Sequence, residues 1–60
     1  MTKKERFFKA FKILEKAGVR LRDITWGQMT RETGYALDQS PELRHQFHQY
    51  RYLYKKEKGK

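Results

Sequence analysis

The residues best suited to chemistry lie between Ser40 and Lys56, where basic and aromatic side chains are interleaved. Four basic residues follow the spacing of one helix face: Arg44, His48, Arg51 and Lys55. A parallel series, one position earlier, marks a neighbouring apolar face: Leu43, Phe47, Tyr50 and Tyr54. Binding to a polyanion requires many cations on one surface, because much of the affinity for nucleic acid comes from counterion release. The pattern therefore predicts a helix that packs by its aromatic face and contacts nucleic acid by its basic face.

Other polar residues of this segment extend the predicted contact surface. His45, Gln49 and Tyr52 carry groups suited to hydrogen bonding with base edges or stacking on base faces. Together with the basic series they give the predicted nucleic-acid contacts of this helix: Arg44, His45, His48, Gln49, Arg51, Tyr52 and Lys55. The alternative interpretation is a solvated helix face without a ligand.

Catalysis and metal binding have little support in the sequence. Ser40 is the only serine, and because Pro41 follows it, a helix cap explains it better than a nucleophile. The chain has no cysteine. Glu42, His45 and His48 share a three-residue spacing, but no fourth metal ligand is evident. We predict no enzyme, no metal and no cofactor.

The charge of the chain points to an anionic partner. Fifteen Lys and Arg residues oppose seven Asp and Glu residues among 60, for a net charge of +8. The excess lies at the two ends, because residues 1–22 carry eight basic and two acidic side chains and residues 43–60 carry six and one. Nucleic acid is the first partner that such a charge suggests, followed by an anionic membrane and then an acidic protein. We predict no membrane partner, because the apolar face of the last helix is rich in tyrosine and is needed by the core. If the ends meet in space, they form one basic surface.

Start and stop signals divide the chain into three helices. A hydroxyl residue can cap the start of each one: Thr2, Thr25 and Ser40. Glycines end the first two: Gly18 and Gly34. We predict an all-α, compact three-helix domain over residues 1–56, with helices at about 3–17, 26–33 and 41–55 and a flexible basic tail at 57–60. The segments 19–23 and 35–39 are expected to be irregular.

The core is expected to be aromatic, because a chain of this length buries only about 60% of its unfolded surface and needs large side chains. Nine of the 60 residues are aromatic. Trp26, the one tryptophan, is the expected core anchor, and the alternative for it is stacking on a base.

The order of helix, loop, short helix ending in glycine, connection and long basic helix resembles a helix-turn-helix domain of the homeodomain or Myb type. Trp26 is similar to the aromatic residue of the second helix in the Myb pattern. Thr30, four positions before Gly34, is similar to the small residue that precedes the turn glycine. The third helix carries a similar basic stretch with aromatic anchors: Leu43, Arg44, Phe47 and Tyr50.

The resemblance implies roles for particular residues. The third helix would enter the major groove of DNA, with base contacts from residues in its first and middle turns: Arg44, His45, His48, Gln49 and Arg51. Arg20 and Arg22, in the loop before the second helix, would contact the phosphate backbone or the minor groove.

We therefore expect a small DNA-binding protein, a transcriptional or nucleoid regulator encoded by a phage or another mobile element. One alternative is an inhibitor or adaptor that docks its basic aromatic face on an acidic protein, and another is an RNA-binding module. No signal peptide or membrane segment is visible, so a cytoplasmic location is expected. The sequence leaves the oligomeric state open.

Overall fold

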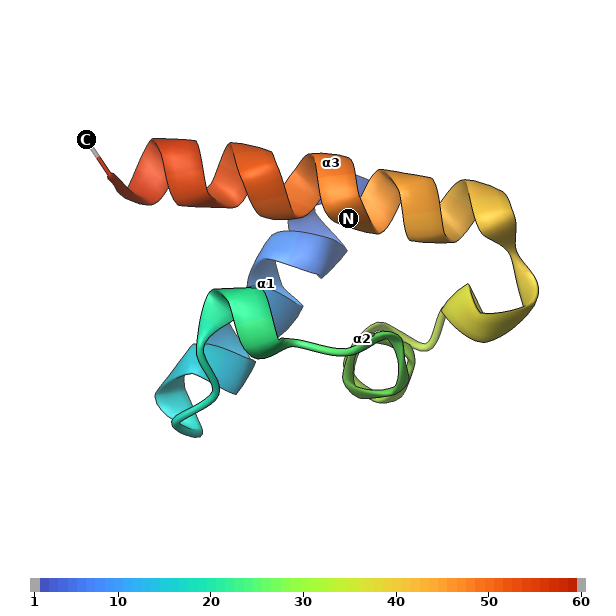
Figure 1. Ribbon diagram of the computed structural model, residues 1–60, viewed down its shortest axis with the longest axis horizontal. Coiled ribbons are helices and arrows are strands. Elements are labelled where there is room, and N and C mark those ends of the chain that lie inside the picture. Colours follow the sequence, from blue (N-terminus) through green and yellow to red (C-terminus); the bar gives the residue numbers. More distant parts are fainter. Residues whose placement is uncertain (1, 60) are drawn as a thin grey trace.

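Three α-helices and two single 3-10 turns make up the fold over residues 2–59, the part of the chain that this computed structural model describes (Figure 1). In chain order they are α1 (Lys3–Lys16), η1 (Leu21–Asp23), α2 (Trp26–Thr33), η2 (Leu37–Gln39) and α3 (Pro41–Lys58). The predicted all-α, three-helix architecture is confirmed. The 3-10 turns fall in the two segments that the sequence leaves irregular.

The helices begin and end where the local chemistry favours it. The hydroxyl groups of the predicted caps accept hydrogen bonds from the backbone N–H three residues on, at 3.2–3.3 Å: Thr2, Thr25 and Ser40. At α2 the Gln28 side chain also accepts from the Thr25 N–H, which completes a capping box. Gly34 follows α2 with a φ of 80°, a left-handed conformation that favours glycine.

The far end of α3 differs from the prediction. The helix continues to Lys58, three residues beyond the predicted end at 55, so Glu57 and Lys58 are helical where the sequence places a tail. Both residues interact with α1. The Lys58 Nζ lies 2.6 Å from Glu15 Oε2, and the Glu57 Oε1 lies 3.6 Å from Lys4 Nζ. Lys and Glu favour a helix, and the two ion pairs join these last residues of α3 to α1.

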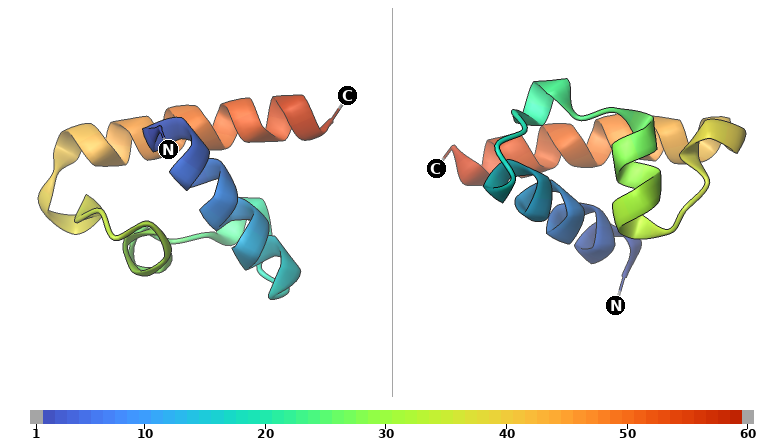
Figure 2. Two further views of the ribbon diagram at one scale, coloured as in Figure 1. Left: turned by 180° about the vertical axis from the view of Figure 1, so that it is seen from behind. Right: turned by 90° about the horizontal axis from the view of Figure 1, so that it is seen from below.

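The long helix α3 organises the arrangement. In Figure 1 it spans the top of the molecule, α1 crosses beneath its middle, and α2 is seen along its axis. Figure 2 shows the same crossing from behind and the length of α2 from below. The connection from Gly18 through η1 returns the chain from the end of α1 to the side of α3.

The core between these helices is largely aromatic. Its buried side chains come from the three helices, from η2 and from Ile24, the residue after η1: Phe7, Ala10, Phe11, Leu14, Ile24, Met29, Leu37 and Phe47. Aromatic pairs join α1 to α3, with ring centroids 5.9 Å apart for Phe11 and Phe47 and 5.2 Å apart for Phe7 and Tyr50. Phe47 is the one residue of α3 that is fully enclosed.

The expectation that Trp26 anchors the core is wrong, because 42% of this residue is exposed. Met29 fills that position instead and is completely buried. Ile24, Met29 and Phe47 already close the core on this side, so the indole lies on the surface beside them. The guanidinium of Arg44 covers it, with Cζ 4.7 Å from the ring centroid.

A polar cluster ties the end of α1 to the last turns of α3. The Tyr54 hydroxyl donates to Glu15 Oε1 at 2.7 Å, and Lys58 donates to Glu15 Oε2 at 2.6 Å. The bond from Lys58, followed by that from Tyr54, lowers the pKa of Glu15 below its ordinary value of 4.5. Burial, followed by the hydrogen bond to Glu15, raises the pKa of Tyr54 to about 12.

The Glu15 cluster predicts a pH-dependent contribution to stability. Glu15→Gln should lower the free energy of unfolding at pH 7 by about 1 kcal/mol, a modest value because Lys58 is largely exposed. Since the folded chain lowers the pKa of Glu15, this contribution is present above pH 4.5 and is lost as the pH falls through the folded value. Urea unfolding at pH 7 and pH 3 should show the difference between wild type and variant shrinking. Glu32→Gln, at an exposed position of α2, is the control. A difference that stays constant with pH would contradict the assignment.

Candidate nucleic-acid interface

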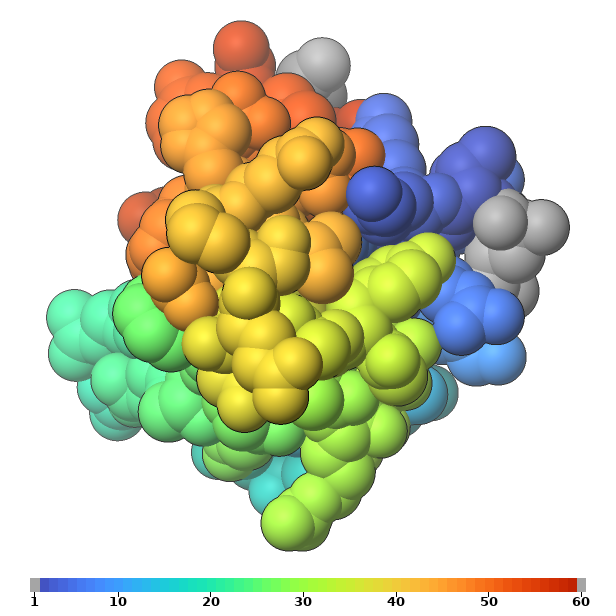
Figure 3. Space-filling view, turned by 90° about the vertical axis from the view of Figure 1, so that its right-hand side faces the viewer, coloured from blue at the N-terminus to red at the C-terminus, as the bar shows by residue number. Residues whose placement is uncertain are grey.

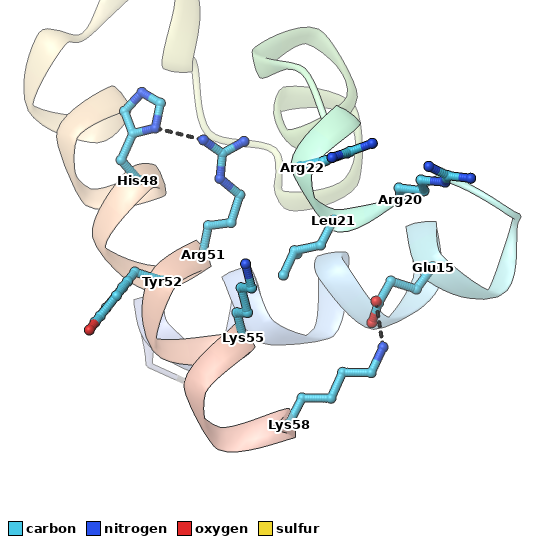
Figure 4. Close-up of a pocket in the computed structure, with 9 residues that line it drawn as sticks. All are labelled: Glu15, Arg20, Leu21, Arg22, His48, Arg51, Tyr52, Lys55 and Lys58. Carbon is cyan, nitrogen blue, oxygen red and sulfur yellow. Dashed lines mark hydrogen bonds and ion pairs between the residues drawn. The ribbon is translucent and has the colours of Figure 1, made fainter. Parts of the chain in front are cut away.

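A basic groove of about 700 Å³ lies between α3 and the η1 segment (Figure 4). Two arginines line it from the η1 side, Arg20 and Arg22, and three cations line it from α3, Arg51, Lys55 and Lys58. The remaining lining residues are Glu15, Leu21, His48 and Tyr52. Two of the eight basic residues in 1–22 therefore share one surface with three from the C-terminal end.

Local structure explains how η1 presents its arginines. Gly18 ends α1 in a left-handed conformation, with a φ of 94°, and reverses the chain. Leu21 then packs against the core and is half-buried, while Arg20 and Arg22 on either side of it are exposed. One apolar anchor thus positions two cations at the wall of the basic groove.

Some cations of the basic groove already have a partner within the protein, and others do not. Lys58 is paired with Glu15, and Arg51 donates to His48 Nδ1 at 3.1 Å while its Cζ lies 4.9 Å from the Phe47 ring centroid. Within residues 2–59, the side chains of Arg20, Arg22 and Lys55 have neither an ion pair nor a hydrogen bond. Three cations therefore remain available to an external anion.

A second, smaller groove of about 390 Å³ adjoins the first. We call it the aromatic groove, because Trp26 and Phe47 line it. Its other lining residues are Ile24, Thr25, Gly27, His48 and Arg51. Since His48 and Arg51 also line the basic groove, the two grooves are neighbours that share these two side chains.

The structure brings together six of the nine predicted contact residues in the basic groove: Arg20, Arg22, His48, Arg51, Tyr52 and Lys55. His45 and Gln49 are exposed on α3 but line neither groove. That any of the nine contacts nucleic acid stays a prediction.

Arg44, the ninth residue, is engaged by the fold. Its Nη1 donates to the carbonyl oxygens of Leu37 at 3.2 Å and Asp38 at 3.0 Å, and its guanidinium covers Trp26. Figure 3 shows the end of the molecule at which these bonds lie, where the first turns of α3, in yellow and orange, rest on the preceding connection. Arg44 therefore holds the connection between α2 and α3, and this use leaves less of its hydrogen-bonding capacity for a ligand.

Several residues that line the grooves are not among the predicted contacts, and three of them bear on binding. Lys58 continues the helical spacing of Arg51 and Lys55, so extending the predicted helix by one turn would have found it. Trp26 and Gly27 line the aromatic groove, but the sequence favours burial for the tryptophan and offers no signal for the glycine.

Comparison of the chain with protein-family models, curated proteins and solved structures finds no match. The helix-turn-helix resemblance stays a sequence prediction. The connection from Gly34 to Ser40, with η2 inside it, is longer than the three or four residues of such a turn.

Two further features are absent from residues 2–59. None of the helices there has the length and apolar character needed to cross a membrane. No group of three or more His, Asp or Glu side chains is placed to hold a metal ion in that part of the chain.

The bonds of Arg44 predict a structural role for this residue. Arg44→Ala should lower the free energy of unfolding by about 1–2 kcal/mol, because two carbonyl groups lose a donor and the indole loses its cation. Arg44→Lys should restore only part of this loss, since an ammonium group cannot reproduce the planar guanidinium. Chemical unfolding followed by circular dichroism measures both. His45→Ala, at the exposed neighbouring position, is the control. An Arg44→Ala variant as stable as the control would refute the role.

Proposed function

We propose that the chain is a small DNA-binding protein that holds a phosphate backbone in the basic groove. The observation that carries the proposal is the convergence of cations from two distant segments on that groove, with Arg20, Arg22 and Lys55 unpaired within residues 2–59. A folded chain gains nothing from repelling cations that lack a partner. A polyanion would neutralise them and release its counterions.

The outer face of α3 supports contact with bases beside that backbone. His45, Gln49 and Tyr52 are exposed and follow helical spacing along α3, and 66% of Tyr52 is accessible. The helix has 18 residues, which corresponds to a length of about 27 Å. The major groove of DNA admits a single helix of this kind. In this arrangement α3 presents polar side chains to base edges while the basic groove holds the adjacent strand.

As a DNA-binding protein of this size, the chain would act as a transcriptional or nucleoid regulator in the cytoplasm. A second candidate is binding to an acidic protein segment. The exposed Tyr52 beside the cations favours it, because tyrosine is enriched among the residues that dominate protein interfaces.

Salt-dependent binding to duplex DNA tests the proposal. Fluorescence anisotropy with a labelled duplex should show an affinity that falls about a hundredfold between 50 and 200 mM salt, as expected for about four phosphate contacts. Arg22→Ala combined with Lys55→Ala should weaken binding and reduce the salt slope by about two units, because each lost cation removes one phosphate contact.

The matched control removes the same charge elsewhere. Lys12 and Lys16 are exposed on α1 and line neither groove, so Lys12→Ala combined with Lys16→Ala should have a much smaller effect. Equal effects of the two double variants would mean that net charge, not the basic groove, drives binding. Binding to an acidic peptide without measurable binding to DNA would favour the second candidate.

A further inference from the structure

The indole of Trp26 is partly exposed and contacts Arg44. Arg44 covers it with a guanidinium that is itself bonded to two backbone carbonyls of the Leu37–Asp38 segment. A large part of the residue nevertheless remains accessible and lines the aromatic groove. Exposed aromatic side chains are the groups on which proteins stack the bases of single-stranded nucleic acid.

Gly27, the next residue along α2, has no evident role in the fold. It does not have the positive φ of Gly18 and Gly34, so its backbone conformation is open to any residue. A Cβ atom there would meet only Thr25 Oγ1, at an ordinary contact distance of 3.9 Å. Glycine disfavours a helix relative to alanine. Because Gly27 lines the aromatic groove, its absent side chain leaves that groove open beside the indole.

The two grooves together have the chemistry of a nucleotide-binding surface. The aromatic groove offers the accessible indole of Trp26, with the buried Ile24 and Phe47 beside it, and the basic groove is lined by five Lys and Arg side chains. His48 and Arg51 line both, so a flat apolar group in the first would lie beside cations that accept its attached anion. A nucleobase with its phosphate combines these two properties. A base within a duplex is paired and stacked and cannot enter such a groove without leaving the helix.

We propose that the aromatic groove binds an unpaired nucleobase, stacked on Trp26, while the adjoining phosphates lie in the basic groove. This inference rests on the proposed function, because it assumes that the basic groove holds a nucleic-acid backbone. It adds a ligand class to that function, a strand with unpaired bases. RNA and single-stranded DNA share this chemistry.

The intrinsic fluorescence of the protein provides a direct test, because Trp26 is its single tryptophan. The wild-type chain is titrated with oligothymidylate, with oligouridylate and with a duplex that carries the same number of phosphates. The single strands should quench the emission of Trp26 and bind about tenfold more tightly than the duplex, as expected for one stacked base. The duplex should bind without quenching. Comparison of the two single strands distinguishes DNA from RNA.

Substitution of Gly27 separates the aromatic groove from the basic groove. Gly27→Leu should fill the groove and abolish both the quenching and the preference for single strands, with the affinity for the duplex unchanged. Gly27→Ala should raise the midpoint of thermal unfolding by roughly 4 °C and weaken single-strand binding, so a loss of binding cannot be ascribed to unfolding. Ala36→Leu, which places the same side chain at an exposed position outside both grooves, should change neither property.

The outcomes distinguish this inference from the function on which it rests. Salt-dependent binding to all three ligands with equal affinity and no quenching would overturn the base-binding groove and leave the proposed function intact. A Gly27→Leu variant that keeps the wild-type preference would also overturn it. No salt-dependent binding to any of the ligands would overturn both.

Discussion

The packing of α1 against α3 through aromatic rings is the interaction on which the rest of the structure depends. Phe47 is the single fully buried residue of an 18-residue helix, and it meets Phe11 at the centre of the crossing. Without cysteines, a chain of this length has no covalent link to hold its elements together. The crossing fixes where α3 lies, and the Leu21 anchor then sets the opposite wall of the basic groove. Loss of this packing would therefore disperse the groove cations as well as the core.

Polar contacts at the periphery join the same helices that the aromatic rings pack together. Glu15 receives hydrogen bonds from Tyr54 and Lys58, so one carboxylate joins the ends of two helices. Several other cations lie over aromatic rings, among them Arg44 over Trp26 and Arg51 over Phe47. In a chain with a net charge of +8, such contacts offset part of the repulsion between like charges. Arg51 thereby contributes both to the fold and to the lining of the basic groove.

The sequence is sufficient to predict the features that depend on local chemistry. The three hydroxyl caps and Gly34 give the starts of all helices and the end of α2, because each cap needs only residues a few positions away. The spacing of Phe47, Tyr50 and Tyr54 gives the face of α3 that packs. The exposure of Trp26 and the extension of α3 to Lys58 depend on partners 18 and 43 residues away, Arg44 and Glu15. Such long-range partners cannot be identified from local periodicity in a single sequence.

In the candidate site, too, local spacing predicts some features and long-range contacts decide the others. Helical spacing places His48, Arg51 and Lys55 on one side of α3, and the structure adds Arg20 and Arg22 across the basic groove. The spacing also groups Arg44 with them, but this residue donates hydrogen bonds to the carbonyl oxygens of Leu37 and Asp38 and so has a structural role. A periodic pattern therefore finds the basic face of the helix and does not separate the cations that bind the protein's own backbone from those that remain free.

The unpaired cations of the basic groove have a consequence for how the protein responds to ionic strength. Added salt screens repulsion between exposed like charges, so it favours the compact state of a strongly basic chain. The same salt competes with phosphates for those cations and weakens any complex with nucleic acid. Folding and binding are thus expected to respond to salt in opposite directions. A bound polyanion replaces the screening that salt provides. It would therefore stabilise the folded chain by mass action at low salt, where the free protein is least stable.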